Sequence, residues 1–363
     1  MTASALLRRL LFLLVGLTFG LAAFAGADAP VAVRTAGNPI IREDMLPGDD
    51  GASINGPSLI RVPAWVKNPL GKYYLYFAHH AGKYLRLAYA DRLEGPWKIH
   101  AGGVQRLDAQ TALVGHLASP DAIVDEANHR IYLFYHGGNP QKKKKGDDAA
   151  DDGEGGQLTA VSVSEDGIHF TPLNVIVGPA YLRVFAHGGA WFALNHSGVL
   201  RRAPRLGAPF EPVAKIIGPE IVAAVDPAAL GEPGATPAAN RPPNGPFRYS
   251  MRHVGLDVFG DRLTVFFSCV GHRPERILAT TVAMRGAPET WRAQGTLEVL
   301  RPGTDAEGAN LPLAYSNGGI SRTRVHELRD PGVIREGAEA WLVYSIAGEH
   351  GLGLARLNYE PQR

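Results

Sequence analysis

The chain has 363 residues, of which 45% are hydrophobic and 20% charged, and its 37 Lys and Arg residues nearly balance 35 Asp and Glu residues. This balance excludes a broad basic surface, so nucleic acid is not expected as a partner. The single cysteine, Cys269, excludes an internal disulfide. The 43 glycines and 27 prolines are spread along the chain and indicate many turns between short strands.

Residues 1–27 have the pattern of a secretory signal peptide. Arg8 and Arg9 precede an apolar run at 10–23, and small residues follow. The apolar run is short for a membrane span of about 20 residues, so cleavage is expected and an uncleaved anchor is the alternative. The mature chain, 28–363, is then expected in a periplasm or outside the cell, without membrane association after cleavage.

Five similar strand-rich segments follow one another along the mature chain. Each contains a short apolar run, a polar turn, an aromatic-rich run such as Tyr73–Phe77 or Leu263–Phe267, and a third run. Repeats of one short antiparallel meander are typical of a β-propeller, whereas a β-sandwich, the alternative, would not require five copies. The sequence therefore predicts one all-β domain, a five-bladed β-propeller over 28–363.

The predicted blades have approximate bounds, and two segments interrupt them. The blades are expected at 55–103, 117–174, 179–214, 250–295 and 327–359. The interruptions, 137–157 and 227–247, are rich in charged residues and in Pro, Ala and Gly respectively. Neither can support a core, so both are expected to be flexible insertions.

Propeller geometry predicts which residues meet. The start of each innermost strand and the turn between the second and third strands lie on one face, where ligands bind. That face would collect many ionisable side chains, which are costly to bury unless they form a site. The strand starts supply Asn55, Asp121, Arg183, Arg252, His253, Arg329 and Asp330, and the turns supply His80, His136, His196, His272, Glu275 and Glu349.

Two short motifs resemble five-bladed glycoside hydrolases, the superfamily of the arabinofuranosidases, xylosidases, levansucrases and invertases. Arg329–Ile334 is similar to the Arg-Asp-Pro run around their base or nucleophile, and Ser119–Ile123 is similar to their Pro-Asp run. The resemblance implies that Asp330 is the base or nucleophile and that Asp121 orients the site and tunes its neighbours. In the arabinanase-like branch the base lies in the first blade, where this chain has Asn55-Gly56-Pro57 without a carboxylate.

Glycoside hydrolysis also needs a protonated carboxyl as the general acid. Glu349 lies between glycines and histidine in a tight turn that can present its side chain, and it is the preferred acid. Glu275 competes, but Arg273 and Arg276 flank it and would lower its pKa, so a salt bridge is the expected role. The motif-like run at Glu94 falls after a third strand and predicts only a surface turn.

The remaining residues of this face are predicted to bind substrate. Its asparagine, histidines and arginines would bind sugar hydroxyls, and Trp65, Tyr181 and Tyr315 are candidates for stacking on a sugar. No metal-ligand spacing is present, so no cofactor is expected. A channel cation such as calcium, held by His253 and water, is an alternative without support from motif spacing.

The sequence therefore predicts an exported enzyme that hydrolyses O-glycosidic bonds of a polysaccharide or oligosaccharide by carboxylate acid/base chemistry. The alternative is a non-catalytic propeller that binds carbohydrate or protein. The hydrolase hypothesis expects Asp121, Asp330 and either Glu275 or Glu349 to line one pocket at the channel mouth.

Overall fold

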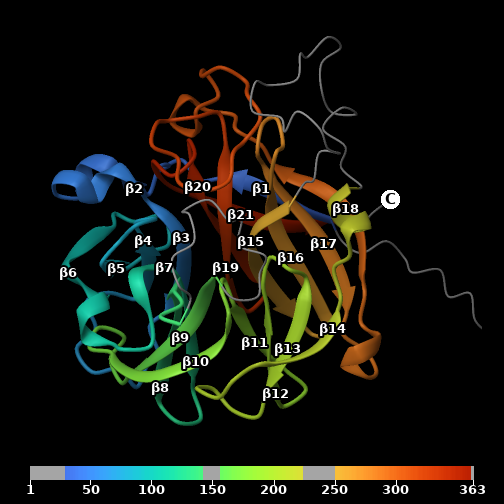
Figure 1. Ribbon diagram of the computed structural model, residues 1–363. Helices are drawn as coiled ribbons and strands as arrows, with labels where there is room; N and C mark the ends of the chain where they lie inside the picture. The colour runs from blue at the N-terminus through green and yellow to red at the C-terminus, as the bar shows by residue number, and fades with distance from the viewer. Residues whose placement is uncertain (1–28, 142–155, 224–249, 361–363) are drawn as a thin grey trace, which may run out of the picture.

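The computed structural model describes residues 29–141, 156–223 and 250–360 (Figure 1). These residues form five antiparallel sheets arranged around a common axis, with strands β3, β7, β11, β15 and β19 innermost. The predicted five-bladed all-β propeller is confirmed. Within the described ranges, no helix has the length and apolar character needed to cross a membrane.

Four blades are simple meanders whose strands pair in chain order. The first blade consists of β3 (Asn55–Arg61), β4 (Tyr73–Ala78), β5 (Tyr84–Ala90) and β6 (Lys98–Arg106), and the second of β7 (Val114–Asp125), β8 (Arg130–Gly138), β9 (Gln157–Ser164) and β10 (Thr171–Pro179). The third consists of β11 (Arg183–His187), β12 (Ala190–Leu194), β13 (Val199–Ala203) and β14 (Glu211–Lys215), and the fourth of β15 (Ser250–Phe259), β16 (Arg262–Val270), β17 (Ile277–Ala283) and β18 (Ala293–Leu300).

The fifth blade joins the two ends of the described chain. Its strands β19 (Leu328–Glu336), β20 (Glu339–Ile346) and β21 (Gly351–Glu360) are completed by the N-terminal strand β1 (Ala29–Arg34), and the short β2 (Ile41–Arg42) also pairs with β21. The sequence analysis did not anticipate this closure. Because β1 comes from the start of the chain, it ties the last blade to the first one.

Helices are few and short in the described ranges. They are α2 (Pro219–Ala223) and the 3-10 helices η1 (Glu43–Met45), η2 (Gly48–Ala52), η3 (Leu107–Ala109), η4 (Pro288–Thr290) and η5 (Asp305–Glu307).

The aromatic-rich runs form the buried second strands of the blades. All six residues of β4 are buried, and Phe266 and Phe267 of β16 are fully enclosed. Side chains from both faces of these strands pack against neighbouring blades, so the core is divided into clusters between sheets. Burial on both faces explains why these runs are continuously apolar and aromatic.

Four of the five innermost strands share an irregularity at the end that faces the mouth of the channel. Their pairing shifts by one residue between Asn55 and Ser58, Ala118 and Asp121, Met251 and Val254, and Arg329 and Gly332. Gly56, Ser119 and Asp330 in these bulges have positive φ, as does Tyr181 just before β11. A bulge re-aims the side chains next to it, so these backbone conformations set the directions of residues such as Ser119 and Asp330.

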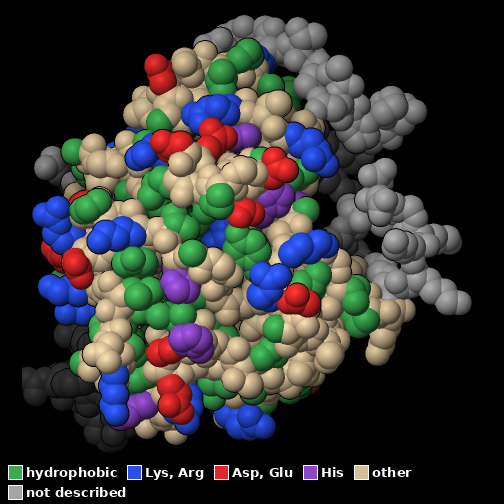
Figure 2. Space-filling model, turned by 90° about the vertical axis from the view of Figure 1, so that its left-hand side faces the viewer, with side chains coloured by type: hydrophobic (Ala, Val, Ile, Leu, Met, Phe, Trp, Pro, Cys, Tyr) green, Lys and Arg blue, Asp and Glu red, His purple; other side chains and the backbone are tan. Residues whose placement is uncertain are grey.

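The outer surface over the first blade carries no extended area of one charge. Figure 2 shows acidic and basic side chains interspersed on this face. This mixture is consistent with the near-neutral composition.

Two groups of sequence predictions fall partly outside the described ranges. The signal peptide at 1–27 and the insertion at 227–247 lie outside them entirely. Of the insertion at 137–157, the described ends belong to β8, which reaches Gly138, and to β9, which begins at Gln157.

Removal of β1 should destabilise the whole ring. A chain that begins at residue 35 loses six residues of pairing with β21, each hydrogen bond contributing about 0.5–1.5 kcal/mol, and its Tm should fall by about 10 °C or more. A chain that begins at residue 28 retains β1 and is the control. Thermal unfolding of the two chains within about 2 °C of each other would show that β1 does not close the propeller.

Candidate active site

A pocket of about 480 Å³ opens at the channel mouth and is called the mouth pocket below. It is lined by Asn55, His79, His80, Ala81, His116, Ala118, Ser119, His136, Gln157, Tyr181, His253, Ile320 and Arg322. Five histidines contribute, and none of these lining residues is Asp or Glu. The predicted face therefore exists, but its carboxylates do not form the wall of the pocket.

The rings of several lining residues gather around Tyr181. Its centroid lies 4.1 Å from that of His136, 4.4 Å from that of His253 and 5.1 Å from that of His196. Tyr181 has φ of 65°, and this conformation turns its side chain to the centre of the mouth. Of the aromatic residues proposed for sugar stacking, Tyr181 alone lines this pocket.

Asp330 lies directly behind His253. Its Oδ1 is 2.5 Å from Nδ1 of His253, and the carboxyl is 1% exposed. Burial alone would raise the pKa of Asp330, but the charge and contact of His253, together with Arg252 and Arg329, lower it well below its ordinary value. Asp330 is therefore an ionised carboxylate that reaches the pocket through an imidazole.

Glu349 stands in the same relation to His80. Its Oε1 lies 3.2 Å from Nδ1 of His80 and accepts a hydrogen bond from Arg329, while Oε2 accepts from Ser53 and Asn55. Burial opposes the charge on Glu349, but the contact with His80 and the charge of Arg329 outweigh it and lower the pKa. An ionised Glu349 is a poor proton donor, which argues against the predicted general-acid role.

Glu275 forms a buried ion pair, as its flanking arginines had suggested, although with a different arginine. Arg252 donates to both carboxylate oxygens at 2.8 and 3.0 Å, and Ser268 donates at 2.6 Å. These contacts and the nearby Arg329 overcome the effect of burial and lower the pKa of Glu275 to about 2. Glu275 does not line the mouth pocket, and its environment also argues against proton donation.

Arg252 and Arg329 also hold the loop that covers one side of the mouth. Arg252 donates to the carbonyls of Asn317 and Gly319, and Arg329 donates to the carbonyl of Gly319. The same loop carries Ile320 and Arg322 into the pocket wall. Two of the three arginines predicted to bind substrate, Arg252 and Arg329, thus position the loop, and protein acceptors occupy their guanidinium groups.

Asp121 and Arg183 lie deeper, in the channel. A small cavity of about 90 Å³ there is lined by residues of all five innermost strands, including both side chains. Arg183 donates to Asp121 at 3.2 Å, and the backbone N–H of Val184 donates to Asp121 at 2.7 Å. Burial raises the pKa of Asp121, although Arg183 and Val184 oppose the shift. The expectation that Asp121 and Asp330 line one pocket is therefore not met, because Asp121 lines the channel cavity and Asp330 lies behind His253.

Two other predicted histidines lie near or behind the pocket. His196 contacts Tyr181 without lining the pocket, and burial lowers its pKa to about 4. His272 is fully buried, and burial likewise lowers its pKa to about 4. Trp65 stacks on His129 and donates to Glu126, outside the mouth pocket, and Tyr315 lies beside Arg273.

Several lining residues were missed by the sequence analysis. His116 and Ser119 belong to β7, which begins earlier than expected, and Gln157 begins β9. Ile320 and Arg322 belong to an irregular segment before β19 that no strand pattern marks. His79 precedes His80 in the same turn and also lines the pocket. The position of this turn between the second and third strands was therefore the sequence feature that pointed to His79.

The first blade has no room for a carboxylate at the bulge. A Cβ placed on Gly56 would lie 2.8 Å from Cα of Ser119, and Gly56 has φ of 59°. Both the close approach and the backbone conformation require glycine. The corresponding bulge position in the fifth blade is occupied by Asp330, so the carboxylate at this position lies in the fifth blade and not in the first.

No group of His, Cys, Asp and Glu among the described residues has an arrangement that could hold a metal ion. The histidines of the mouth instead contact carboxylates, aromatic rings or Gln157.

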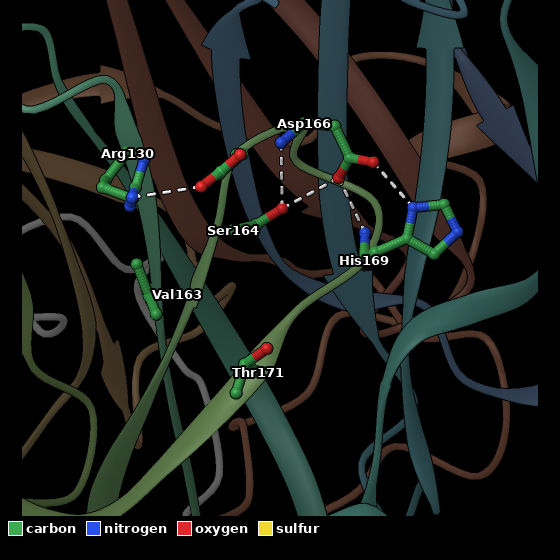
Figure 3. A pocket seen from close by; sticks show the side chains of 7 residues that line it. Arg130, Val163, Ser164, Asp166, His169 and Thr171 are labelled. Carbon is green, nitrogen blue, oxygen red and sulfur yellow. Dashed lines mark hydrogen bonds and ion pairs between the residues drawn. The ribbon is translucent and has the colours of Figure 1, made fainter.

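A third cavity, of about 260 Å³, lies on the outside of the second blade (Figure 3). Its polar groups are paired within its own turn, where Asp166 accepts from Ser164, Ile168 and His169, and Arg130 pairs with Glu165. The arrangement stabilises the turn between β9 and β10 and explains the lowered pKa of Asp166, about 2, despite its partial burial.

Comparison with solved structures defines the class of the fold. The chain is similar to a putative glycoside hydrolase from Parabacteroides distasonis, with a TM-score of 0.56, 13% identity, and coverage of 92% of this chain and 97% of the other. A thermostable family-43 glycoside hydrolase matches with a TM-score of 0.53, 11% identity, and coverage of 84% and 89%. The protein has the five-bladed propeller fold of these glycoside hydrolases.

Sequence comparison defines the family. No family model matches the chain. It is 32% identical over 346 residues to an uncharacterized protein of Acanthamoeba polyphaga mimivirus, covering 90% of both chains. The chain belongs to the same protein family as this viral protein.

Removal of the buried charge at Glu275 should destabilise the fold. Glu275→Gln leaves Arg252 without its ionised partner, and the loss should be about 3–5 kcal/mol in urea unfolding. Glu339→Gln, which removes an exposed partner of Arg356, should change stability by less than about 0.5 kcal/mol.

The same ion pair predicts the direction of a pH effect. Because the pKa of Glu275 is lowered on folding to about 2 from 4.5, its stabilisation is present above the higher value and is lost as pH falls through the lower one. The stability difference between the wild type and Glu275→Gln should therefore shrink below about pH 4. A difference independent of pH in urea unfolding would contradict an ionised Glu275.

Proposed function

We propose that this protein is a carbohydrate-active enzyme that hydrolyses an O-glycosidic bond of a polysaccharide or oligosaccharide in the mouth pocket. The observation that carries the proposal is the pair of imidazoles in the pocket, His253 and His80, each backed by a buried ionised carboxylate. The shared fold adds support, because a family-43 enzyme from Xanthomonas citri with the same fold is known in complex with xylotriose (TM-score 0.52, 12% identity, coverage of 91% and 89%).

The proposed mechanism moves the acid/base work from carboxylates to histidines. Nδ1 of His253 faces Asp330, so Nε2 is the nitrogen that takes a proton from water. The water oxygen then bonds to the anomeric carbon as the glycosidic C–O bond breaks. His80, whose Nδ1 lies 3.2 Å from Oε1 of Glu349, gives its proton to the leaving oxygen. Asp330 and Glu349 are positioning residues that orient and polarise the imidazoles.

Binding without cleavage is the second candidate function. It is favoured by the absence of Asp and Glu from the lining of the mouth pocket and by the lowered pKa values of Glu275 and Glu349. A non-catalytic propeller would bind the same saccharides and release no product. For either function we propose an exported protein, as the pattern of residues 1–27 predicts.

Substitution of either member of the His253–Asp330 pair should slow cleavage strongly. His253→Gln and Asp330→Asn should each lower kcat by about a hundredfold or more, because proton transfer by a positioned group contributes on this order. Asn tolerates the left-handed conformation of residue 330, whose φ is 50°. The measurement is release of reducing ends from a panel of polysaccharides, with the pH profile of kcat for each active variant.

Asp44→Asn, which removes an exposed carboxylate that does not line the mouth pocket, is the control and should cleave at the wild-type rate. Saccharide binding by the wild type without any product would favour the binding function. Wild-type kcat in both His253→Gln and Asp330→Asn would remove this pair from the mechanism.

A further inference from the structure

We propose that the saccharide recognised by the mouth pocket is acidic, with its carboxylate or sulfate group seated against His116 and His136. This inference rests on the proposed function, because it names the substrate class of the same pocket. It derives from the charges of the pocket wall, which are distributed unevenly between its histidines.

Two lining histidines already have acidic partners. His253 contacts Asp330 and His80 contacts Glu349, and both carboxylates lie behind the wall. Arg252 and Arg329 accompany these carboxylates and Glu275 in the same buried layer. Charge in this layer is thus paired within the protein and leaves little attraction for an external cation.

The other side of the pocket has no such acidic partner. His116 contacts the neutral Gln157 and lies with its ring 5.8 Å from that of His136. His136 is 2% exposed, and its Nδ1 has no hydrogen-bond partner among the described residues. His136 lines the pocket, and a buried nitrogen without a partner is costly, so a hydrogen-bonding group that reaches it would be stabilising.

The ionisable groups that most strongly oppose a positive charge on these two histidines are other histidines and Lys83. Burial lowers the pKa of His136 far below its ordinary value, and His116, His253, His80 and His196 lower it further. Burial also lowers the pKa of His116, as do His80 and Lys83, while the contact with Gln157 opposes the shift. An anion placed here would relieve the repulsion and draw a proton onto the pair.

Arg322 adds a permanent positive charge to the same pocket. It is exposed, it lines the pocket, and within the described chain it forms no ion pair. No acidic side chain lines the pocket. An anionic ligand would therefore meet no carboxylate of the wall that competes with it for Arg322 or for the histidine pair.

Proton uptake on binding sets the sign of the pH dependence. An acidic ligand raises the pKa of His116 or His136, so binding strengthens as pH falls, by up to about tenfold per pH unit for one full proton. An uncharged sugar gains nothing from this effect. The difference between charged and uncharged forms of one saccharide therefore measures the proposal.

The probes are tri-galacturonate, its methyl ester with the charges removed, and a sulfated galactose trisaccharide, measured by isothermal titration calorimetry at about pH 5.5 and pH 7.5. Tri-galacturonate or the sulfated sugar should bind about tenfold or more tighter than the methyl ester at the lower pH, with a smaller preference at the higher pH. Whichever anion binds identifies the acidic group. Two buffers of different ionisation enthalpy should report proton uptake.

Arg322→Gln and His136→Gln should each weaken binding of the acidic sugar several-fold without weakening the methyl ester equally. Arg285→Gln removes an exposed charge outside the pocket and should change neither. Arg322 is exposed, so its variant keeps the test valid if His136→Gln fails to fold. Equal or tighter binding of the methyl ester would overturn the acidic substrate class while leaving the proposed function intact. Failure of every charged and uncharged saccharide to bind would overturn both.

Discussion

The ring depends on one guanidinium in its central channel. Arg183 of the third blade donates to the carbonyl of Val254 in the fourth, to the carbonyl of Pro120 and the carboxylate of Asp121 in the second, and to the carbonyl of Pro57 in the first. Strand ends that meet at an axis leave backbone carbonyls without sheet partners, and Arg183 satisfies several of them at once. Asp121 supplies the counter-charge that makes burial of this cation affordable.

This constraint helps to explain why the wall of the mouth pocket is lined by histidines and not by carboxylates. With Asp121 committed to Arg183 and Gly56 held to glycine by Ser119, two inner-strand positions cannot offer a free carboxylate to a ligand. Asp330 and Glu349 are present but lie under His253 and His80. These carboxylates therefore lie behind the pocket wall, and the basic groups that line the pocket are five imidazoles and Arg322.

The fold was accessible from the sequence because burial on both faces of the second strands produces five aromatic-rich runs, and the runs repeat. The end of the ring that carries the site was also accessible: Asn55, His80, His136 and His253 meet there. The sequence did not reveal which of the predicted residues line the pocket and which lie deeper in the channel. Ser119 and Asp121 are two residues apart, yet the bulge between them separates the pocket wall from the channel interior, and no residue pattern marks a bulge.

The parts missed by sequence reasoning share a physical cause, since they depend on contacts between distant segments. Strand β1 acquires its role only by pairing with β21, and the loop that carries Arg322 acquires its place only through Arg252 and Arg329. The same dependence bears on function. A propeller of the glycoside-hydrolase type fixes where a ligand binds, but the side chains at the bulges decide the chemistry. In this ring the bulges hold Gly56, Ser119, His253 and Asp330, and these side chains differ from blade to blade although the fold repeats.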